Sequence, residues 1–202
     1  MIEKRQRKEF LLDLMEELEE KAIKAGSYQV PFLEKMISFM DRPDEPEILF
    51  PPYKDTGKNI AVNAYSYEYE NQVLDIYVAD YNFEQNEADL LSINMTAVSE
   101  IANRAKRFIT NSKSLLQTID HSLEAYDLAK LIDEVMSSLN EVNIFVITNM
   151  YYTSNKPVEI TIPGIETVNV QVWDIARVQQ LITSEQAIET DYIDFDQDYG
   201  ET

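Results

Sequence analysis

The chain has 202 residues, with 17 Lys and Arg against 37 Asp and Glu, so its formal net charge is −20 with the single histidine neutral. This length allows one large domain with a buried core, and 45% hydrophobic residues exclude a disordered acidic chain. The lack of cysteine excludes disulfides, cysteine zinc sites and thiol nucleophiles. Charges recur every few residues at the N-terminus, so we expect no signal peptide, no contact with membranes and a cytoplasmic location.

The acidic excess is uneven along the chain. Residues 59–103 contain eight carboxylates and no Lys or Arg, and a basic stretch follows them directly: Arg104, Lys106, Arg107 and Lys113. These four cations are candidates for nucleic-acid binding, but cations on one solvated helix face also commonly pair with nearby carboxylates. A net charge of −20 opposes tight nucleic-acid binding by this chain alone, because Lys and Arg supply most of the affinity for phosphate.

Two helices are predicted at the start of the chain, over residues 6–25 and 31–40. Apolar residues step by three or four positions in the first of them, and Gly26 stands where a C-cap glycine would. Residues 41–58 contain four of the seven prolines, so we expect a loop there.

The period changes to two after this proline-rich stretch, which predicts an antiparallel hairpin of strands 59–67 and 73–81. Longer apolar patterns then predict further helices and strands: helices 87–109 and 115–139, a strand at 143–150 buried on both faces, a strand at 168–173, a short helix from Asp174 and a last strand at 191–195. This order indicates an α/β fold, a three-layer sandwich with a mixed sheet flanked by helices. We expect one domain over residues 1–195, and an acidic tail at 196–202 that leads into a longer natural chain.

Several common catalytic motifs are absent. The four glycines are scattered, so no phosphate-binding glycine loop is present. The single histidine, His121, has no second His or Cys to complete a ligand set, and no G-x-S-x-G turn presents a serine to it. We therefore expect His121 to lie on the surface or to cap a helix.

One group of polar residues has the spacing of a metal site. Asp80 ends a row of core-facing apolar residues in the second hairpin strand, and Asn63 and Asn82 could converge with it at the same edge of the sheet. A carboxylate with neighbouring oxygens at strand ends is typical of a Mg²⁺ site. Alternatively, Asp80 and Asn82 close the strand into a turn and cap the next helix.

The order and spacing of short motifs resemble the N-terminal domain of the AIPR family, the abortive-infection phage-resistance proteins. The segments that carry the resemblance are VNAY (62–65), LDIYVADY (74–81), EAYDLA (124–129), IFVITN (144–149), VQVWD (170–174) and YIDF (192–195). The resemblance implies a bacterial phage-defence protein whose N-terminal domain has a restriction-endonuclease-like PD-(D/E)xK core.

Carrying that motif onto this chain places its catalytic positions at Asn63, Asp80 and Asn82, with Asp80 as the metal ligand and Mg²⁺ as the cofactor. Asn63 stands where the family has aspartate, and Asn82 stands in place of the motif lysine. Such a nuclease needs two carboxylates for the metal and a lysine near the attacking water. We therefore expect a nuclease-like domain with a degenerate catalytic set, and the sequence leaves open whether any enzymatic activity remains.

A second hypothesis is a non-catalytic interaction or oligomerisation module with an acidic surface. The apolar stripe of helix 87–109 suits either pairing between chains or packing in the core. The expected partners are thus weakly bound nucleic acid, a basic protein, or a second copy of the chain.

Overall fold

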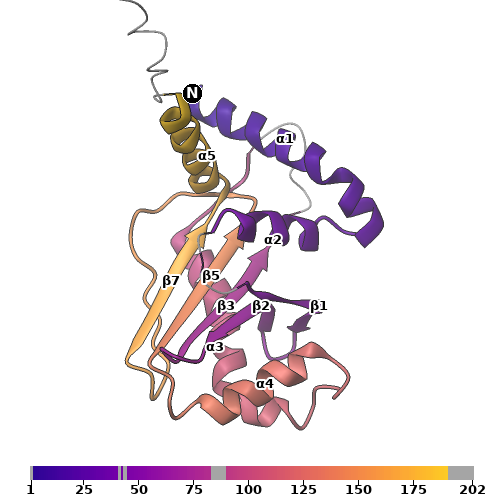
Figure 1. Cartoon of the computed structure of the whole chain (residues 1–202), viewed down its shortest axis with the longest axis vertical. Helices are drawn as coiled ribbons and strands as arrows, with labels where there is room; N and C mark the ends of the chain where they lie inside the picture. The colour runs from indigo at the N-terminus through magenta and orange to yellow at the C-terminus, as the bar shows by residue number, and fades with distance from the viewer. Residues whose placement is uncertain (1, 41, 43–44, 83–89, 191–202) are drawn as a thin grey trace, which may run out of the picture.

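The computed structural model describes residues 2–40, 42, 45–82 and 90–190 (Figure 1). Helices and strands follow in this order: α1 Ile2–Ala25, α2 Gln29–Ser38, β1 Glu47–Asp55, β2 Ile60–Glu68, β3 Val73–Asp80, β4 Ser92–Ile93, α3 Met95–Leu115, α4 Glu124–Val135, β5 Glu141–Thr148, β6 Tyr151–Tyr152, β7 Thr167–Trp173 and α5 Ile175–Thr190. In the described part of the chain, no helix is long and apolar enough to cross a bilayer.

A mixed five-stranded sheet forms the centre of the fold, with the strand order β1-β2-β3-β5-β7. β1, β2 and β3 pair antiparallel, and β3, β5 and β7 pair parallel. The predicted hairpin, the buried central strand and the last predicted sheet strand before α5 are thus confirmed as β2–β3, β5 and β7.

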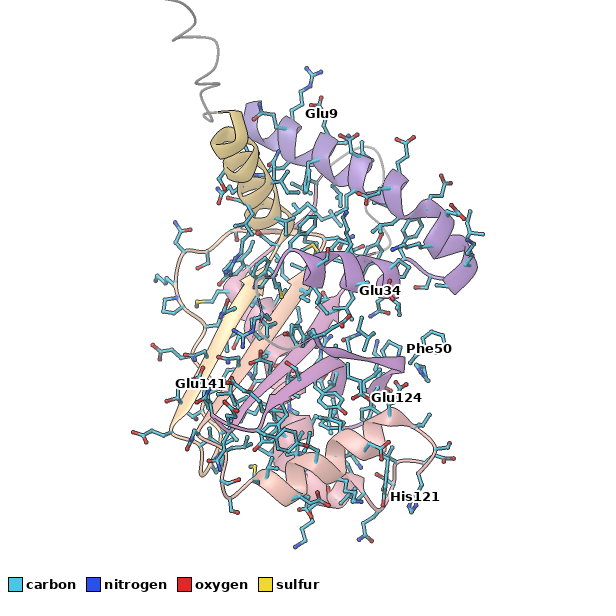
Figure 2. All side chains as sticks on the ribbon, viewed as in Figure 1. Glu9, Glu34, Phe50, His121, Glu124 and Glu141 are labelled. Carbon is cyan, nitrogen blue, oxygen red and sulfur yellow. The ribbon has the colours of Figure 1, made fainter. Side chains whose placement is uncertain are left out.

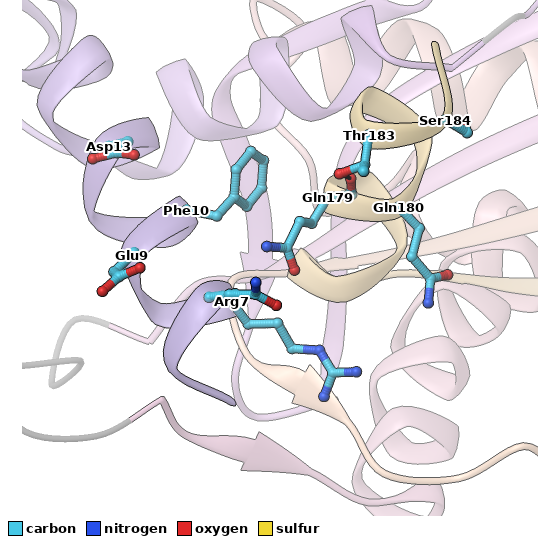
Figure 3. A pocket seen from close by; sticks show the side chains of 9 residues that line it. Arg7, Glu9, Phe10, Asp13, Gln179, Gln180, Thr183 and Ser184 are labelled. Atoms are coloured by element: carbon cyan, nitrogen blue, oxygen red, sulfur yellow. Dashed lines mark hydrogen bonds between the residues drawn. The ribbon is translucent and has the colours of Figure 1, made fainter. Parts of the chain in front are cut away.

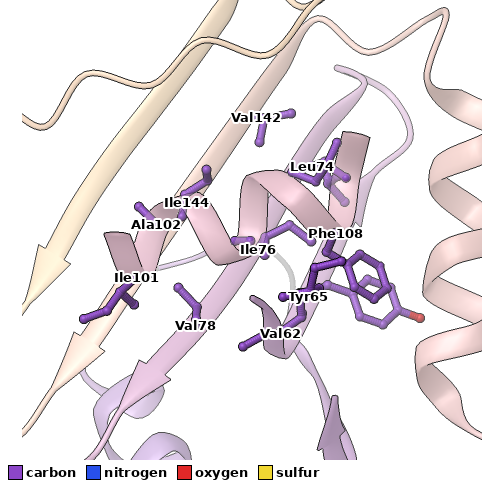
Figure 4. Packing of buried hydrophobic residues seen from close by; sticks show 14 of the residues in the cluster. Val62, Tyr65, Leu74, Ile76, Val78, Ile101, Ala102, Phe108, Val142 and Ile144 are labelled. Atoms are coloured by element: carbon purple, nitrogen blue, oxygen red, sulfur yellow. The ribbon is translucent and has the colours of Figure 1, made fainter. Parts of the chain in front are cut away.

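Both faces of the sheet are covered. Leu74, Ile76 and Val78 of β3 pack in the core on the side of α3 and α4 (Figure 4). Tyr77 and Ala79 alternate with them and pack in a second core with residues of α1, α2 and α5. The alternation follows from the period of two in a strand, and it confirms the predicted layers of helix, sheet and helix.

The first two helices agree with the sequence prediction within a few residues. α1 ends at Gly26, which adopts φ 70°, and Ser27 N donates to Ala22 O at 3.1 Å. This left-handed geometry favours glycine, because a Cβ atom would be strained there.

The predicted loop over residues 41–58 is wrong in its second half, where β1 forms an edge strand. Prolines are tolerated there because the outer side of an edge strand needs no ladder hydrogen bond. The pairing jumps from Ile48 opposite Ala64 to Tyr53 opposite Val62, so Pro51 and Pro52 lie in a bulge. The prolines therefore mark a bulged edge strand instead of a loop.

The two long central helices differ from their predicted bounds. α3 begins only after Asn94, whose side chain caps it by accepting from Ala97 N at 2.9 Å. Leu91 lies before that cap, so the apolar pattern starts earlier than the helix and the predicted start at 87 is wrong. α4 is shorter than residues 115–139, because Asp120 Oδ1 accepts from Ser122 N at 2.9 Å in a turn before the helix.

The remaining predictions for the C-terminus, the strand at 191–195 and the acidic tail at 196–202, lie outside the described residues.

Asp174 joins two parts of the fold, which gives a stability prediction. Its Oδ1 accepts from Arg177 N at 2.9 Å as the N-cap of α5, and its Oδ2 accepts from Tyr152 N at 2.7 Å. We expect Asp174→Ala to lower the free energy of unfolding by about 2 kcal/mol in urea denaturation, because it removes the cap and leaves a second donor unpaired. Asp174→Asn retains one acceptor oxygen and should lose clearly less; equal losses would contradict this role.

Candidate functional site

Asn63 lies where β2 begins beside the end of β3, and it is 3% exposed. Its Oδ1 accepts a hydrogen bond from Ala79 N at 2.8 Å. The regular pairing of β2 with β3 begins at Ala64 opposite Tyr77. The Asn63 side chain therefore supplies the acceptor for Ala79 N just beyond the end of this pairing. The Asn63 side-chain oxygen is therefore used as a hydrogen-bond acceptor within the sheet.

Asp80 lies on the face of β3 that packs against α3, as the alternation predicts. Its Oδ1 is 3.4 Å from Nη1 of Arg104 on α3, and the Asp80 side chain is 35% exposed. The only carboxylate of the candidate set thus faces a fixed guanidinium at the margin of the core.

Asn82 follows β3 and is held by its backbone. Its N–H donates to Oδ1 of Asn149 at 2.9 Å, and its carbonyl accepts from Nδ2 of Asn149 at 3.0 Å. Asn149 is completely buried and follows β5, so its amide clamps the carboxyl ends of two parallel strands together. The sequence motif points to Asn82, but the side chain that holds the two strand ends together is that of Asn149.

These residues do not fit a Mg²⁺ ion. The set holds one carboxylate, Asp80, and the Asn63 oxygen is already used by the backbone. Lys58, which precedes β2, lies 3.8 Å from Asp55 Oδ2. Across the described residues, no group of three or more His, Cys, Asp or Glu is arranged to hold a metal. The binding of Mg²⁺ therefore stays a prediction, and the described residues provide no set of ligands for it.

The four cations of α3 do not form one face. Arg107 Nη1 lies 2.9 Å from Glu100 Oε1, and this hydrogen bond lowers the pKa of Glu100 below its usual range. Arg104 is one turn away on the same side of the helix and pairs with Asp80. Lys106 and Lys113 are seven residues apart and share a different side of α3. Nucleic-acid binding by this stretch stays a prediction, with its two arginines already paired.

The start of α1 carries a second basic stretch, which the charge of the whole segment does not reveal. Residues 1–25 sum to a charge near zero, which hides Lys4, Arg5, Arg7 and Lys8 at the start of α1. Arg7 stacks its guanidinium over the Tyr151 ring at 4.3 Å. It also lines a cavity of about 700 Å³ between α1 and α5 (Figure 3). Glu9 and Asp13 line the same cavity, so it has no single sign of charge.

A row of polar side chains crosses the other face of the sheet. The strand register places Ser66, Asp75, Asn143 and Asn169 side by side on β2, β3, β5 and β7. Asn143 Nδ2 donates to Asp75 Oδ1 at 2.9 Å, Asn169 Nδ2 donates to Asn143 Oδ1 at 3.0 Å, and Arg42 pairs with Asp75 Oδ2. Burial raises the pKa of Asp75 above its usual value, and the bonds from Asn143 and Arg42 offset only part of the rise. The row is therefore a structural network of hydrogen bonds across this face of the sheet.

The sequence contains a signal for this row. The third residue of each parallel strand is polar inside an apolar run: Asp75, Asn143 and Asn169. Only the register brings the three together, so single strands read alone do not reveal it.

Residues 32–180 match the sequence model of the family described as abortive infection phage resistance protein N-terminal domain. The match spans most of the chain, which therefore belongs to this family and is a domain of a phage-defence protein. No curated protein and no solved structure matches the chain.

The bond from Ala79 to Asn63 gives a direct test of the structural role of Asn63. We expect Asn63→Ala to lower the free energy of unfolding by about 1–3 kcal/mol, because a buried N–H loses its acceptor. Urea denaturation measures this loss. Asn103→Ala is the matched control, since its Nδ2 donates only to Ser99 O on α3 at 2.9 Å, and it should change stability by less than about 0.5 kcal/mol. Similar losses in both variants would contradict the assignment.

The raised pKa of Asp75 predicts a pH-dependent stability. The folded chain keeps the Asp75 proton to higher pH than the unfolded chain, whose ordinary pKa is 3.8. The stability contributed by Asp75 therefore falls as pH rises through the window just above 3.8. Asp75→Asn removes this titration and keeps an acceptor for Arg42.

The measurement is urea unfolding of both proteins across this pH window. The wild type should lose stability relative to Asp75→Asn as pH rises and then keep a constant difference. A wild type that gains on the variant with rising pH would show that the Arg42 pair outweighs burial.

Proposed function

We propose that this chain is a nuclease-like but non-catalytic interaction domain of an abortive-infection phage-defence protein. The observation that carries the proposal is the commitment of all three motif positions to structural contacts. Asn63 completes the sheet, Asp80 pairs with Arg104, and the Asn82 backbone is clamped by Asn149.

The arrangement of strands supports the nuclease-like part of the proposal. Three antiparallel strands, β1 to β3, are followed by a helical crossover to β5, which lies parallel to β3. This is the kind of mixed sheet flanked by helices that the resemblance to PD-(D/E)xK proteins leads us to expect.

The chemistry supports the non-catalytic part. Metal-dependent hydrolysis needs carboxylates that hold the ion and a base or cation near the attacking water. The Asn82 side chain carries no charge, and the cation that contacts the candidate set, Arg104, already pairs with Asp80. Losing one preorganised charged group commonly lowers kcat by about 10²–10³, so we expect two losses to lower it further.

The charge balance favours a basic protein partner. A chain with a net charge of −20 repels phosphate backbones, and it equally repels a second copy of itself. A partner rich in Lys and Arg instead gains attraction over long range.

We expect the purified chain not to cleave plasmid or linear DNA in the presence of Mg²⁺ or Mn²⁺, measured by gel electrophoresis against buffer alone. The double variant Asn63→Asp/Asn82→Lys supplies both side chains that the motif lacks, and the carboxylate introduced by Asn63→Asp can still accept from Ala79 N. We expect metal-dependent nicking from this double variant and none after the further change Asp80→Ala.

Two outcomes would contradict the proposal. Cleavage by the wild type that disappears in Asp80→Ala would show an active nuclease. A folded double variant without any cleavage would remove the support for a nuclease-like site.

A further inference from the structure

The bulge in β1 turns one large aromatic side chain outward. Four residues of β1 lie between Ile48 and Tyr53, where β2 has the single residue Asn63 between their partners. Leu49 is completely buried in the core, whereas Phe50 is 67% exposed. Bulges of this kind re-aim a side chain, and here the buried leucine anchors the bulge while the phenylalanine points to solvent.

The backbone of Phe50 is held in place although its side chain is exposed. Its N–H donates to Glu124 Oε2 on α4 at 2.6 Å. The next two residues, Pro51 and Pro52, have no N–H and a restricted φ. This stretch of the edge therefore offers another strand few hydrogen bonds, and contact here must be made by side chains. Figure 2 shows Phe50 of β1 beside Glu124, pointing away from the fold.

Three carboxylates of β1 and α4 lie close to Phe50 or to Tyr65 on the paired strand β2. Tyr65 Oη donates to Glu47 Oε2 at 2.7 Å. Burial raises the pKa of Tyr65, and the carboxylates of Glu47, Asp127 and Glu124 raise it further, which places all three near one phenol. Among the described residues, no Lys or Arg forms an ion pair with any of them. The three carboxylates, of which Glu124 contacts Phe50 directly, together form an acidic rim that has no ion-paired cation in the described part of the chain.

We propose that Phe50 and the carboxylates of Glu47, Glu124 and Asp127 form the docking surface for a basic protein segment that carries an apolar side chain. The proposal rests on the interaction role given to the domain above, and it names the partner's chemistry. A rigid aromatic anchor with a polar rim is the arrangement that concentrates binding energy in protein interfaces. The local carboxylates and the net charge of −20 select a cationic partner and disfavour nucleic acid or a second copy.

The test uses the full chain and two short fluorescent peptides of Lys and Arg. One peptide has two central leucines, and the other has serines at those places with the same charge. Fluorescence anisotropy at low and moderate salt gives the Kd of each. We expect the wild type to bind the leucine peptide about tenfold more tightly, which is about 1.4 kcal/mol.

Phe50→Ser should abolish this preference with no change in thermal stability, because the side chain is mostly exposed. Tyr69→Ser, which removes an aromatic side chain that is 75% exposed elsewhere on the chain, is its matched control and should retain the preference. A preference for the leucine peptide that survives Phe50→Ser would overturn the proposal, as would equal affinities in the wild type.

The acidic rim has its own matched pair of variants. Asp127→Asn should weaken both peptides about threefold at low salt, and less at moderate salt. Asp133→Asn makes the same charge change on the other side of α4 and should leave both affinities unchanged. Equal weakening by the two variants would show attraction to the total charge alone and overturn the docking surface.

The cleavage assay on the same preparations separates this proposal from the proposed function. DNA cleavage by the wild type would overturn the non-catalytic role and leave the Phe50 result standing. A lost leucine preference without cleavage would overturn only the docking surface.

Discussion

β3 lies between two helical layers, and the burial of both its faces constrains every polar group around it. Leu74, Ile76 and Val78 pack toward α3, while Tyr77 packs on the other side. A polar atom in such a strand cannot use water, so it must find a partner inside the protein. The Asn63 acceptor for Ala79, the Asn149 clamp and the Asp75 network all meet this requirement.

The same constraint explains why an uncharged amide side chain suits position 63 of this sheet, where the nuclease motif would have a carboxylate. The Asn63 oxygen accepts from Ala79 N without bringing a second carboxylate close to Asp80, which pairs with Arg104. Two neighbouring carboxylates would raise the pKa of one another unless a cation lay between them. Replacing an aspartate by asparagine therefore keeps the backbone contact and removes the need for a metal.

Strands with a strong apolar period are visible in the sequence because burial on both faces leaves few other solutions. β3 and β5 lie within about two residues of their predicted bounds for this reason. β1 was hidden because its prolines read as a loop, although an edge strand with a bulge accommodates them. Asn149 and the Arg42–Asp75 pair depend on register and on contacts between distant segments, which no local pattern contains.

The net charge of a sequence segment does not show which of its charged side chains are paired in the fold and which are available for binding. Arg104 and Arg107 of α3 pair with Asp80 and Glu100, so two of the four cations in this stretch already face carboxylates. The carboxylates of the acidic rim come from β1 (Glu47) and α4 (Glu124 and Asp127), which are far apart in sequence. The packing of α4 against the sheet edge brings them together. An exposed aromatic side chain with an acidic rim beside it remains at the surface, on a sheet edge whose prolines discourage strand pairing. That combination suits the proposed role of this mixed α/β domain, the binding of a basic protein.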